Sequence, residues 1–238
     1  MIAHRPPVYP KLKPARPLKV RTVTIAVGML CRDGVVIAAD SELSIRNYSK
    51  HYESKVSHTE GKDWALVFSY ADEPGLYLRA REEIMRKFRD SSHHLPEIAY
   101  SISAEVFEEM KYPHKEIELQ MLIGVSCFTS EAKLLWFDGK TLHWASEIHR
   151  LGTGDASLVQ YLCDGLYTPS IAIEDRIKIA AYIVGRAKSY IEGCSGDTTL
   201  CVLHDRERPR YKLPEEIGEI EYAMLAREKE GLRTIAGV

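Results

Sequence analysis

Thr24 and Asp40 are the residues whose types and positions could do chemistry together. Thr24 lies in an apolar run that continues to Leu30, and Asp40 ends a second run, Val35 to Ala39. A buried carboxylate beside a hydroxyl needs a cation, because an unpaired charge is costly to bury. Residues 42–62 contain three candidate lysines: Lys50, Lys55 and Lys62. The pattern does not choose among them, and alone it favours Asp40 as an ordinary strand-end residue.

The register of the hairpin decides whether Thr24 and Asp40 share a face. If the turn is the three residues Arg32-Asp33-Gly34, with Gly34 left-handed, Ala26 pairs with Asp40. Thr24 then lies one diagonal step from Asp40 on the same face, roughly 7–8 Å away. A two-residue turn would put their side chains on opposite faces. The sequence alone leaves the two registers open.

Strands and helices alternate in groups along the rest of the chain. The hairpin and a strand at 64–70 precede helices over 75–89 and 96–112. Strands at 117–128, 133–137 and 141–147 precede helices over 155–167 and 171–190. A buried strand at 198–204 and a charged, peripheral helix at 214–230 complete the order. This grouping predicts an α+β fold, a four-layer αββα sandwich of two antiparallel sheets flanked by helices.

Charge and proline separate a leader from the rest of the chain. Residues 1–23 contain six Lys and Arg, no Asp or Glu, and five of the eleven prolines. The other 26 basic and 34 acidic residues give 24–238 a net charge of −8. Proline at this density excludes a helix or a central strand. We therefore expect a basic Pro-rich leader or propeptide at 1–23 and a single domain at 24–238.

Several function classes are disfavoured by the composition. The leader lacks the apolar core of a secretory signal, and no apolar run spans a bilayer. Five cysteines without a Cys-x-x-Cys pair indicate neither a disulfide framework nor a zinc site, and they fit a reducing cytoplasm. The Gly152-Thr153-Gly154 loop lacks the Gly-Lys-Ser/Thr ending of a phosphate-binding loop. The acidic body does not favour nucleic acid. We expect no metal and no cofactor.

The stretch from Thr24 to Ser41 resembles the opening of proteasome subunits. A short apolar strand turns at Arg32-Asp33-Gly34 and returns along Val-Val-Ile-Ala-Ala to Asp40. Weaker similarities follow in the family's order and extend the resemblance over most of 22–215: Lys55-Val56, Ala71-Asp72, Gly152-Thr153-Gly154 and Cys194-Ser195-Gly196. The chain thus resembles β-type or bacterial proteasome subunits, of the N-terminal nucleophile hydrolase superfamily.

The resemblance implies roles for particular residues. Thr24 matches the nucleophile that propeptide removal exposes as a new N-terminus, and its α-amine would be the general base. Lys55 would lower the pKa of the threonine hydroxyl, and Asp40 would orient Lys55. Cys194, Ser195 and Glu192 match positions that support the amine. Leu43 and Phe68 match positions beside the substrate.

The chain also departs from the family pattern at four positions. Val23 precedes the nucleophile where glycine is usual, and Thr22 is a competing threonine. Phe68 replaces a glycine beside the substrate strand, Cys194 replaces a serine, and Asp155 replaces a small residue. These departures favour, as an alternative, a non-catalytic and unprocessed ring or scaffold subunit. A small-molecule amidohydrolase of the same superfamily is a third interpretation.

The expected function is therefore threonine-type peptide-bond hydrolysis by a self-compartmentalised, proteasome-like subunit. The resemblance implies polypeptide substrates, a ring homo-oligomer in the cytoplasm and, by analogy, an ATP-dependent unfoldase as partner. Neither nucleic acid nor a membrane is expected as a partner.

Overall fold

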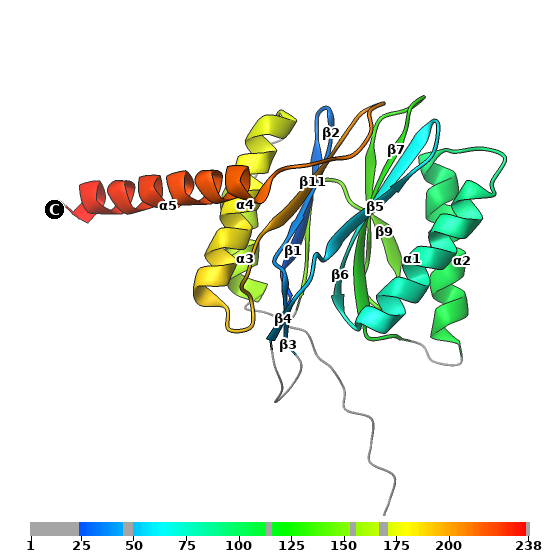
Figure 1. Cartoon of the computed structure of the whole chain (residues 1–238), viewed down its shortest axis with the longest axis horizontal. Helices are drawn as coiled ribbons and strands as arrows, with labels where there is room; N and C mark the ends of the chain where they lie inside the picture. The colour runs from blue at the N-terminus through cyan, green and yellow to red at the C-terminus, as the bar shows by residue number, and fades with distance from the viewer. Residues whose placement is uncertain (1–23, 45–49, 113–115, 153–155, 167–170, 237–238) are drawn as a thin grey trace, which may run out of the picture.

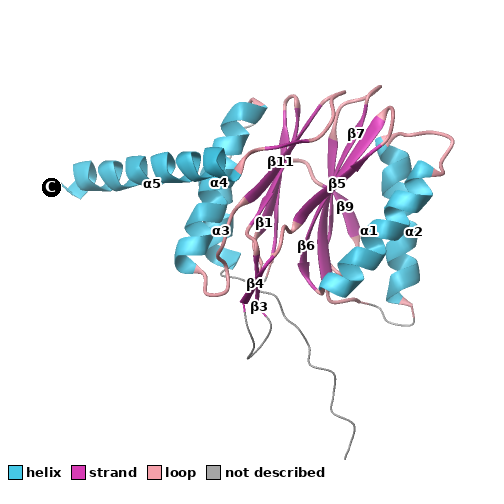
Figure 2. Cartoon of the chain, in the orientation of Figure 1, coloured by secondary structure: helices cyan, strands magenta, loops and turns pink. Residues whose placement is uncertain are grey.

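A computed structural model of the chain describes residues 24–44, 50–112, 116–152, 156–166 and 171–236. Two antiparallel sheets lie face to face, with a pair of helices on each outer side (Figures 1 and 2). The expected αββα sandwich is confirmed. The leader, residues 1–23, is outside the described residues.

The first sheet holds the hairpin predicted around Asp33. Its strand order is β10-β1-β2-β11-β12, with β1 at Ala26–Cys31, β2 at Gly34–Ala39 and β10 at Ile148–Leu151. Strand β11 (Thr199–His204) pairs with β2 and with the short edge strand β12 (Arg210–Tyr211). Because β2 is central and buried on both faces, it is apolar throughout.

The turn of this hairpin contains two residues, so the register that would put Thr24 and Asp40 on one face is not the one formed. Cys31 pairs with Gly34 and Ala26 with Ala39, so the turn is Arg32-Asp33. Gly34 is the first residue of β2, with φ +153°, and a Cβ there would lie 2.4 Å from the carbonyl oxygen of Leu203. Glycine is therefore needed for the close approach of β11, not for the turn.

The second sheet has the order β5-β6-β7-β8-β9. Its strands are β5 (Val56–Glu60), β6 (Trp64–Asp72), β7 (Leu119–Cys127), β8 (Lys133–Phe137) and β9 (Leu142–Trp144). Alternate residues of β6 point to opposite faces: Leu66, Phe68 and Tyr70 pack under the helices, whereas Ala65 and Val67 pack between the sheets. Side chains of both sheets form that central core.

Two helix pairs cover the outer faces. Helices α1 (Pro74–Arg89) and α2 (Pro96–Lys111) cover the second sheet, and α3 (Ala156–Leu166) and α4 (Ile173–Tyr190) cover the first. Both α1 and α2 begin with proline, which suits the first turn because it has no N–H to leave unpaired. The predicted helices differ from these only at their ends.

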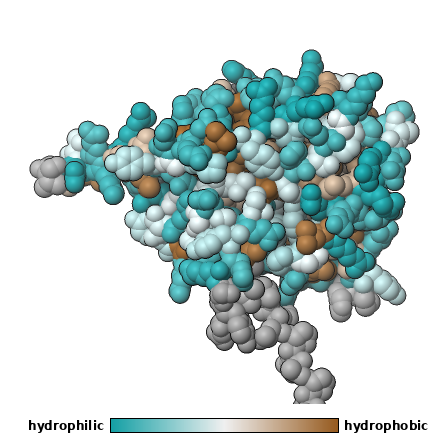
Figure 3. Space-filling model, viewed as in Figure 1, coloured by the Kyte–Doolittle hydropathy of each residue, from teal (hydrophilic) through white to brown (hydrophobic). Residues whose placement is uncertain are grey.

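Helix α5 (Pro214–Ala236) extends from the body as an arm (Figures 1 and 3). The part of the helix up to Glu228 packs on α4 through Ile217, a Lys188–Glu221 ion pair of 2.9 Å and an Arg186–Glu228 ion pair of 3.2 Å. Leu232 and Ile235, near its end, are exposed. The helix is peripheral, as its many charges predicted.

Candidate active site

The polar centre of the fold is an ion pair that joins the two sheets. Asp40 follows β2 in the first sheet, and Lys55 precedes β5 in the second. The Lys55 ammonium lies 3.0 Å from each carboxylate oxygen of Asp40, and both side chains are fully buried. Of the three candidate cations, the structure thus selects Lys55. Lys62 is exposed in the β5–β6 turn, and Lys50 pairs elsewhere.

Backbone amides complete the coordination of Asp40. Its carboxylate accepts the N–H of Ile25 at 3.0 Å and the N–H of Glu42 at 3.2 Å. Its own N–H donates to the carbonyl of Ile25 at 3.2 Å. The strand pairing ends at Ala26–Ala39, so the Asp40 side chain can turn back to the start of β1. Asp40 therefore contacts Ile25, the residue next to Thr24, in the two-residue register.

Thr24 is fully buried at the N-terminal side of β1. Within the described part of the chain, its hydroxyl has no hydrogen-bond partner. A buried hydroxyl without a partner is uncommon, since it loses its bonds to water. The hydroxyl is therefore available to react or to bind another group.

Gly152 packs closely against the backbone carbonyl of Thr24. Its φ is +119°, and a Cβ there would lie 1.6 Å from the carbonyl oxygen of Thr24. Its N–H donates to the side-chain oxygen of Gln120 at 3.2 Å. Any other residue at 152 would displace Thr24. The rest of this loop, Thr153 to Asp155, lies outside the described residues.

Burial controls the protonation of the ion pair. It lowers the pKa of Lys55 below that of an exposed lysine, and the Asp40 carboxylate opposes this shift. It raises the pKa of Asp40, against the Lys55 ammonium and the two backbone amides. A buried group whose pKa is shifted by desolvation and opposed by a specific charged partner is a candidate for a functional site.

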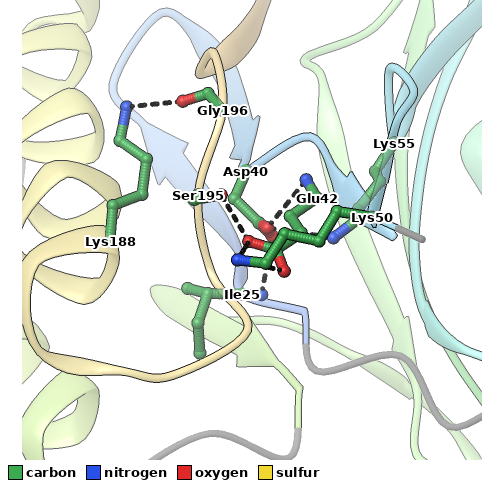
Figure 4. A network of polar contacts seen from close by, with 8 residues as sticks. All are labelled: Ile25, Asp40, Glu42, Lys50, Lys55, Lys188, Ser195 and Gly196. Carbon is green, nitrogen blue, oxygen red and sulfur yellow. Dashed lines mark hydrogen bonds and ion pairs between the residues drawn. The ribbon is translucent and has the colours of Figure 1, made fainter. Parts of the chain in front are cut away.

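The three predicted supporting residues have different surroundings. Cys194 is buried near the ion pair, and burial raises the pKa of its thiol to about 12, so it is protonated at neutral pH. Ser195 is half-buried and donates its hydroxyl to Glu42, while its carbonyl accepts the N–H of Ser41 at 3.3 Å. Glu192 is exposed. Ser195 is therefore in the same network as Asp40 (Figure 4).

The two predicted substrate-binding residues are not together. Leu43 is half-buried in the small hairpin of β3 (Glu42–Ser44) and β4 (Lys50–Tyr52). Phe68 is fully buried in the core under α1 and α2. It offers no exposed surface to a substrate in this structure, because its face of β6 points away from the other sheet. Its neighbour Ser69 lies on the opposite face, fully buried.

Glu42 is a site residue that the sequence reasoning missed. Its side chain is fully buried and lies 3.1 Å from the Lys50 ammonium. Its burial and its partners come from contacts between distant segments, which the sequence pattern did not indicate. Within the described residues, no group of three or more His, Cys, Asp or Glu side chains could hold a metal ion.

Comparison with solved structures gives the fold a precedent. An Anbu Gly-1 mutant from Hyphomicrobium sp. strain MC1 has a TM-score of 0.74 and 12% identity, over 90% of this chain and 99% of that one. The chain shares its fold with Anbu. Anbu (ancestral beta-subunit) from Yersinia bercovieri has a TM-score of 0.73 and 12% identity, over 90% of this chain and 96% of that one. Anbu from Pseudomonas aeruginosa, described as a helical assembly, has a TM-score of 0.69 and 14% identity, over 88% of this chain and 96% of that one.

These likenesses correct the family expected from sequence. These three structures are Anbu, one of them described as an ancestral beta-subunit, whereas the sequence had indicated β-type or bacterial proteasome subunits. At 11–14% identity they establish the fold alone. No family model and no curated protein matches the sequence. No helix in the described ranges is long and apolar enough to cross a membrane.

Proposed function

We propose that this chain is an Anbu-like, threonine-type peptidase whose nucleophile is Thr24, exposed after removal of residues 1–23. The observation that carries the proposal is the buried Asp40–Lys55 pair, whose carboxylate also binds the amide next to Thr24. A buried ion pair contributes little net stability, because desolvation offsets its attraction. A chemical role explains its presence better than a structural one.

The proposed reaction uses only protein groups. The Thr24 hydroxyl attacks a peptide carbonyl, and its proton passes to the Thr24 α-amine, directly or through water. The tetrahedral intermediate then expels the leaving amine, which takes that proton. Water hydrolyses the remaining ester and regenerates the threonine. An α-amine suits this role, because its unperturbed pKa is about 7.7–8.0.

Lys55 and Asp40 assist through charge and position. The Lys55 ammonium stabilises the developing alkoxide, and Asp40 orients that ammonium through two contacts of 3.0 Å. Asp40 also binds the Ile25 amide, so one carboxylate sets the lysine and the start of β1 together.

Leader removal would use the same hydroxyl. Attack of Thr24 on the Val23 carbonyl breaks the peptide bond and forms an ester, which water hydrolyses to free the α-amine. Val23 is bulkier than the glycine usual before such a nucleophile. This substitution, and the complete burial of Thr24, favour the second candidate: an unprocessed, non-catalytic subunit of an Anbu-like assembly.

Assembly and partners follow by analogy. The Pseudomonas aeruginosa Anbu is described as a helical assembly, which supports a homo-oligomer for this chain. Self-compartmentalisation, polypeptide substrates and an ATP-dependent unfoldase belong to the same proposal, and a cytoplasmic location stays a prediction.

Two measurements on the purified full chain test the proposal. Intact mass should show Thr24 as the first residue, and a fluorogenic peptide should be hydrolysed. Thr24→Ala should reduce hydrolysis by at least about 10³-fold, because no other group replaces the nucleophile. Thr22→Ala is the matched control and should process and react normally. A chain that keeps Met1 and hydrolyses no peptide supports the non-catalytic candidate instead.

A further inference from the structure

A cleft lies where β4, the loop before β11 and the segment around β12 meet. Its volume is about 420 Å³. Three large apolar side chains of its lining are exposed to solvent: Tyr52 by 60%, Tyr211 by 40% and Leu213 by 62%. Exposed apolar side chains that gather in one place mark a binding surface, whereas single ones scattered over the surface do not.

Both tyrosines of the cleft are held in place by their surroundings. The ring of Tyr52 packs on Gly196, where a Cβ would lie 2.6 Å from the ring. The ring of Tyr211 meets that of His58 edge to face, with centroids 5.3 Å apart, and its hydroxyl donates to the carbonyl of Val56 at 3.4 Å. Because these walls are preorganised, an occupant does not have to order them, which lowers the entropic cost of binding.

The charges of the lining favour a basic occupant. Glu53 and Asp197 both line the cleft and are exposed. Neither forms an ion pair with another residue of the described chain. Against these two acids, the described lining contains a single basic side chain, Lys212. The cleft therefore combines tyrosine rings with a net negative charge, which suits a segment that carries both apolar and basic side chains.

The leader contains such a segment at residues 13–20. Pro-rich sequences favour the polyproline II conformation, which has three residues per turn. Residues three apart then share an edge of the helix. One edge is apolar and the next is basic: Pro14, Pro17 and Val20 on the first, and Lys13, Arg16 and Lys19 on the second. Segments with prolines at this spacing bind grooves lined by aromatic side chains.

The segment is also near enough along the chain to reach the cleft. Ala26 of β1 pairs with Ala39 of β2, and Ala39 pairs with Thr199 of β11, which lines the cleft. Neighbouring strands are about 4.8 Å apart, so Thr199 lies about 10 Å from the start of β1. The four peptide units between Val20 and Thr24 extend up to about 14 Å.

We propose that this cleft binds the chain's own leader through residues 13–20, with the proline edge against the tyrosines and the basic edge toward Glu53 and Asp197. The inference goes beyond the proposed function and does not depend on it, because the contact needs no reaction at Thr24. It also gives the contrast between a basic leader and an acidic body a physical reason.

A labelled peptide tests the docking on the full chain. Two chains are compared, both with Thr24→Ala so that the leader stays attached, which intact mass verifies. A chain that also carries Pro14→Gly and Pro17→Gly has an open cleft and should bind a fluorescein-labelled peptide of residues 11–21, measured by fluorescence anisotropy. The chain with the unchanged leader should bind it at least about tenfold more weakly, because a tethered segment competes at an effective concentration in the millimolar range.

Variants of the open chain locate the contact. Tyr52→Ala should weaken peptide binding at least about tenfold, because aromatic anchors carry much of the energy of an interface. Tyr161→Ala is the matched control, since Tyr161 lies on α3, outside the lining, and is 74% exposed. Glu53→Gln with Asp197→Asn should weaken binding about three- to tenfold and reduce its dependence on salt. Both acids are exposed, so this variant tests the contact independently of any effect of Tyr52 on folding.

Several results would overturn the inference, and none of them involves peptide hydrolysis. One is equal binding of the peptide by the chains with the unchanged and the altered leader. Another is equal affinity of the Tyr52→Ala and Tyr161→Ala chains. A third is equal binding of a peptide of the same composition whose period of three is scrambled, because charge alone would then explain the affinity. Competition that rises with protein concentration would assign the contact to the leader of a second copy, against our assignment to the same chain.

Discussion

Lys55 and Lys87 form ion pairs of nearly equal length in very different surroundings. The Lys55 ammonium lies 3.0 Å from Asp40, and both side chains are fully buried between the sheets. The Lys87 ammonium, on α1, lies 2.9 Å from Glu105 and 3.1 Å from Glu109, both on α2 and both more than half exposed. Their pKa values shift in opposite directions: burial lowers that of Lys55, and hydrogen bonds to Glu105 and Glu109 raise that of Lys87.

Contact distance alone therefore does not indicate the role of an ion pair. At the surface, water still solvates both partners, so the pair adds little and costs little. Between the sheets, each charge has lost its water, so the partners depend on each other and on the Ile25 and Glu42 amides. A chain gains little net stability from the second arrangement, which is why a chemical role is proposed for Lys55 and a role in helix packing for Lys87.

The largest expected effect comes from breaking the buried pair on one side. Lys55→Met leaves the Asp40 carboxylate buried without its cation, which should lower the free energy of unfolding by about 3–5 kcal/mol. Peptide hydrolysis should fall at least about 10²-fold, because the alkoxide loses its cation. Urea denaturation and the peptide assay measure the two losses.

A double variant separates the two losses. Lys55→Met with Asp40→Asn removes both charges, so much of the stability should return. Hydrolysis should not return, because the ammonium is still missing. A single Lys55→Met variant as stable as the wild type would contradict our distinction between the two ion pairs.

The order of elements could be predicted from the sequence because it rests on periodicity and turn residues. Apolar β-branched runs identify β1, β2 and β11, and apolar residues at helical spacing identify α1 and α2. The apolar runs alone did not identify Asp40 as a site residue; its place in the candidate site came from the resemblance to proteasome subunits.

The details that failed depend on contacts between distant segments. Gly34 indicated a turn, but its conformation serves the approach of Leu203, which is far away in sequence. Strand β6 is buried on both faces, so its pattern does not say which face holds Phe68. Lys55 could not be separated from Lys50 because both are lysines near a loop. For Gly34 and Phe68, a shift of one residue in register changes the outcome.

His149 extends the comparison to a group that burial keeps neutral. Its ring stacks on Trp136 with centroids 3.7 Å apart, and burial, with help from Arg150 and His143, lowers its pKa from 6.5 to about 4. The folded protein therefore binds this proton less tightly than the unfolded chain does. The contribution of neutral His149 to the free energy of unfolding is complete above about pH 6.5. It is lost as the pH falls toward 4, and the total loss is up to about 3 kcal/mol.

His149→Phe keeps a stacking ring and removes the titration. As the pH falls from 7 to 4.5, the free energy of unfolding should fall less in the variant than in the wild type. The difference between the two proteins should therefore shift in favour of the variant. Urea denaturation at the two pH values measures this change. An unchanged difference between the two proteins would mean that burial does not control this histidine.

The smallest expected effect comes from the surface pair, and it sharpens the comparison with Lys55. Lys87→Met should lower Tm by no more than about 4 °C at low salt, because solvent screens all three partners. At 1 M salt the Debye length is about 3 Å, so that small difference should vanish. The loss caused by Lys55→Met should persist in the same salt, since ions do not enter the space between the sheets. Thermal unfolding of both variants at low and high salt therefore compares two lysines whose contact distances are nearly equal. If high salt removed the loss of Tm in Lys55→Met, Lys55 would behave as a surface residue like Lys87.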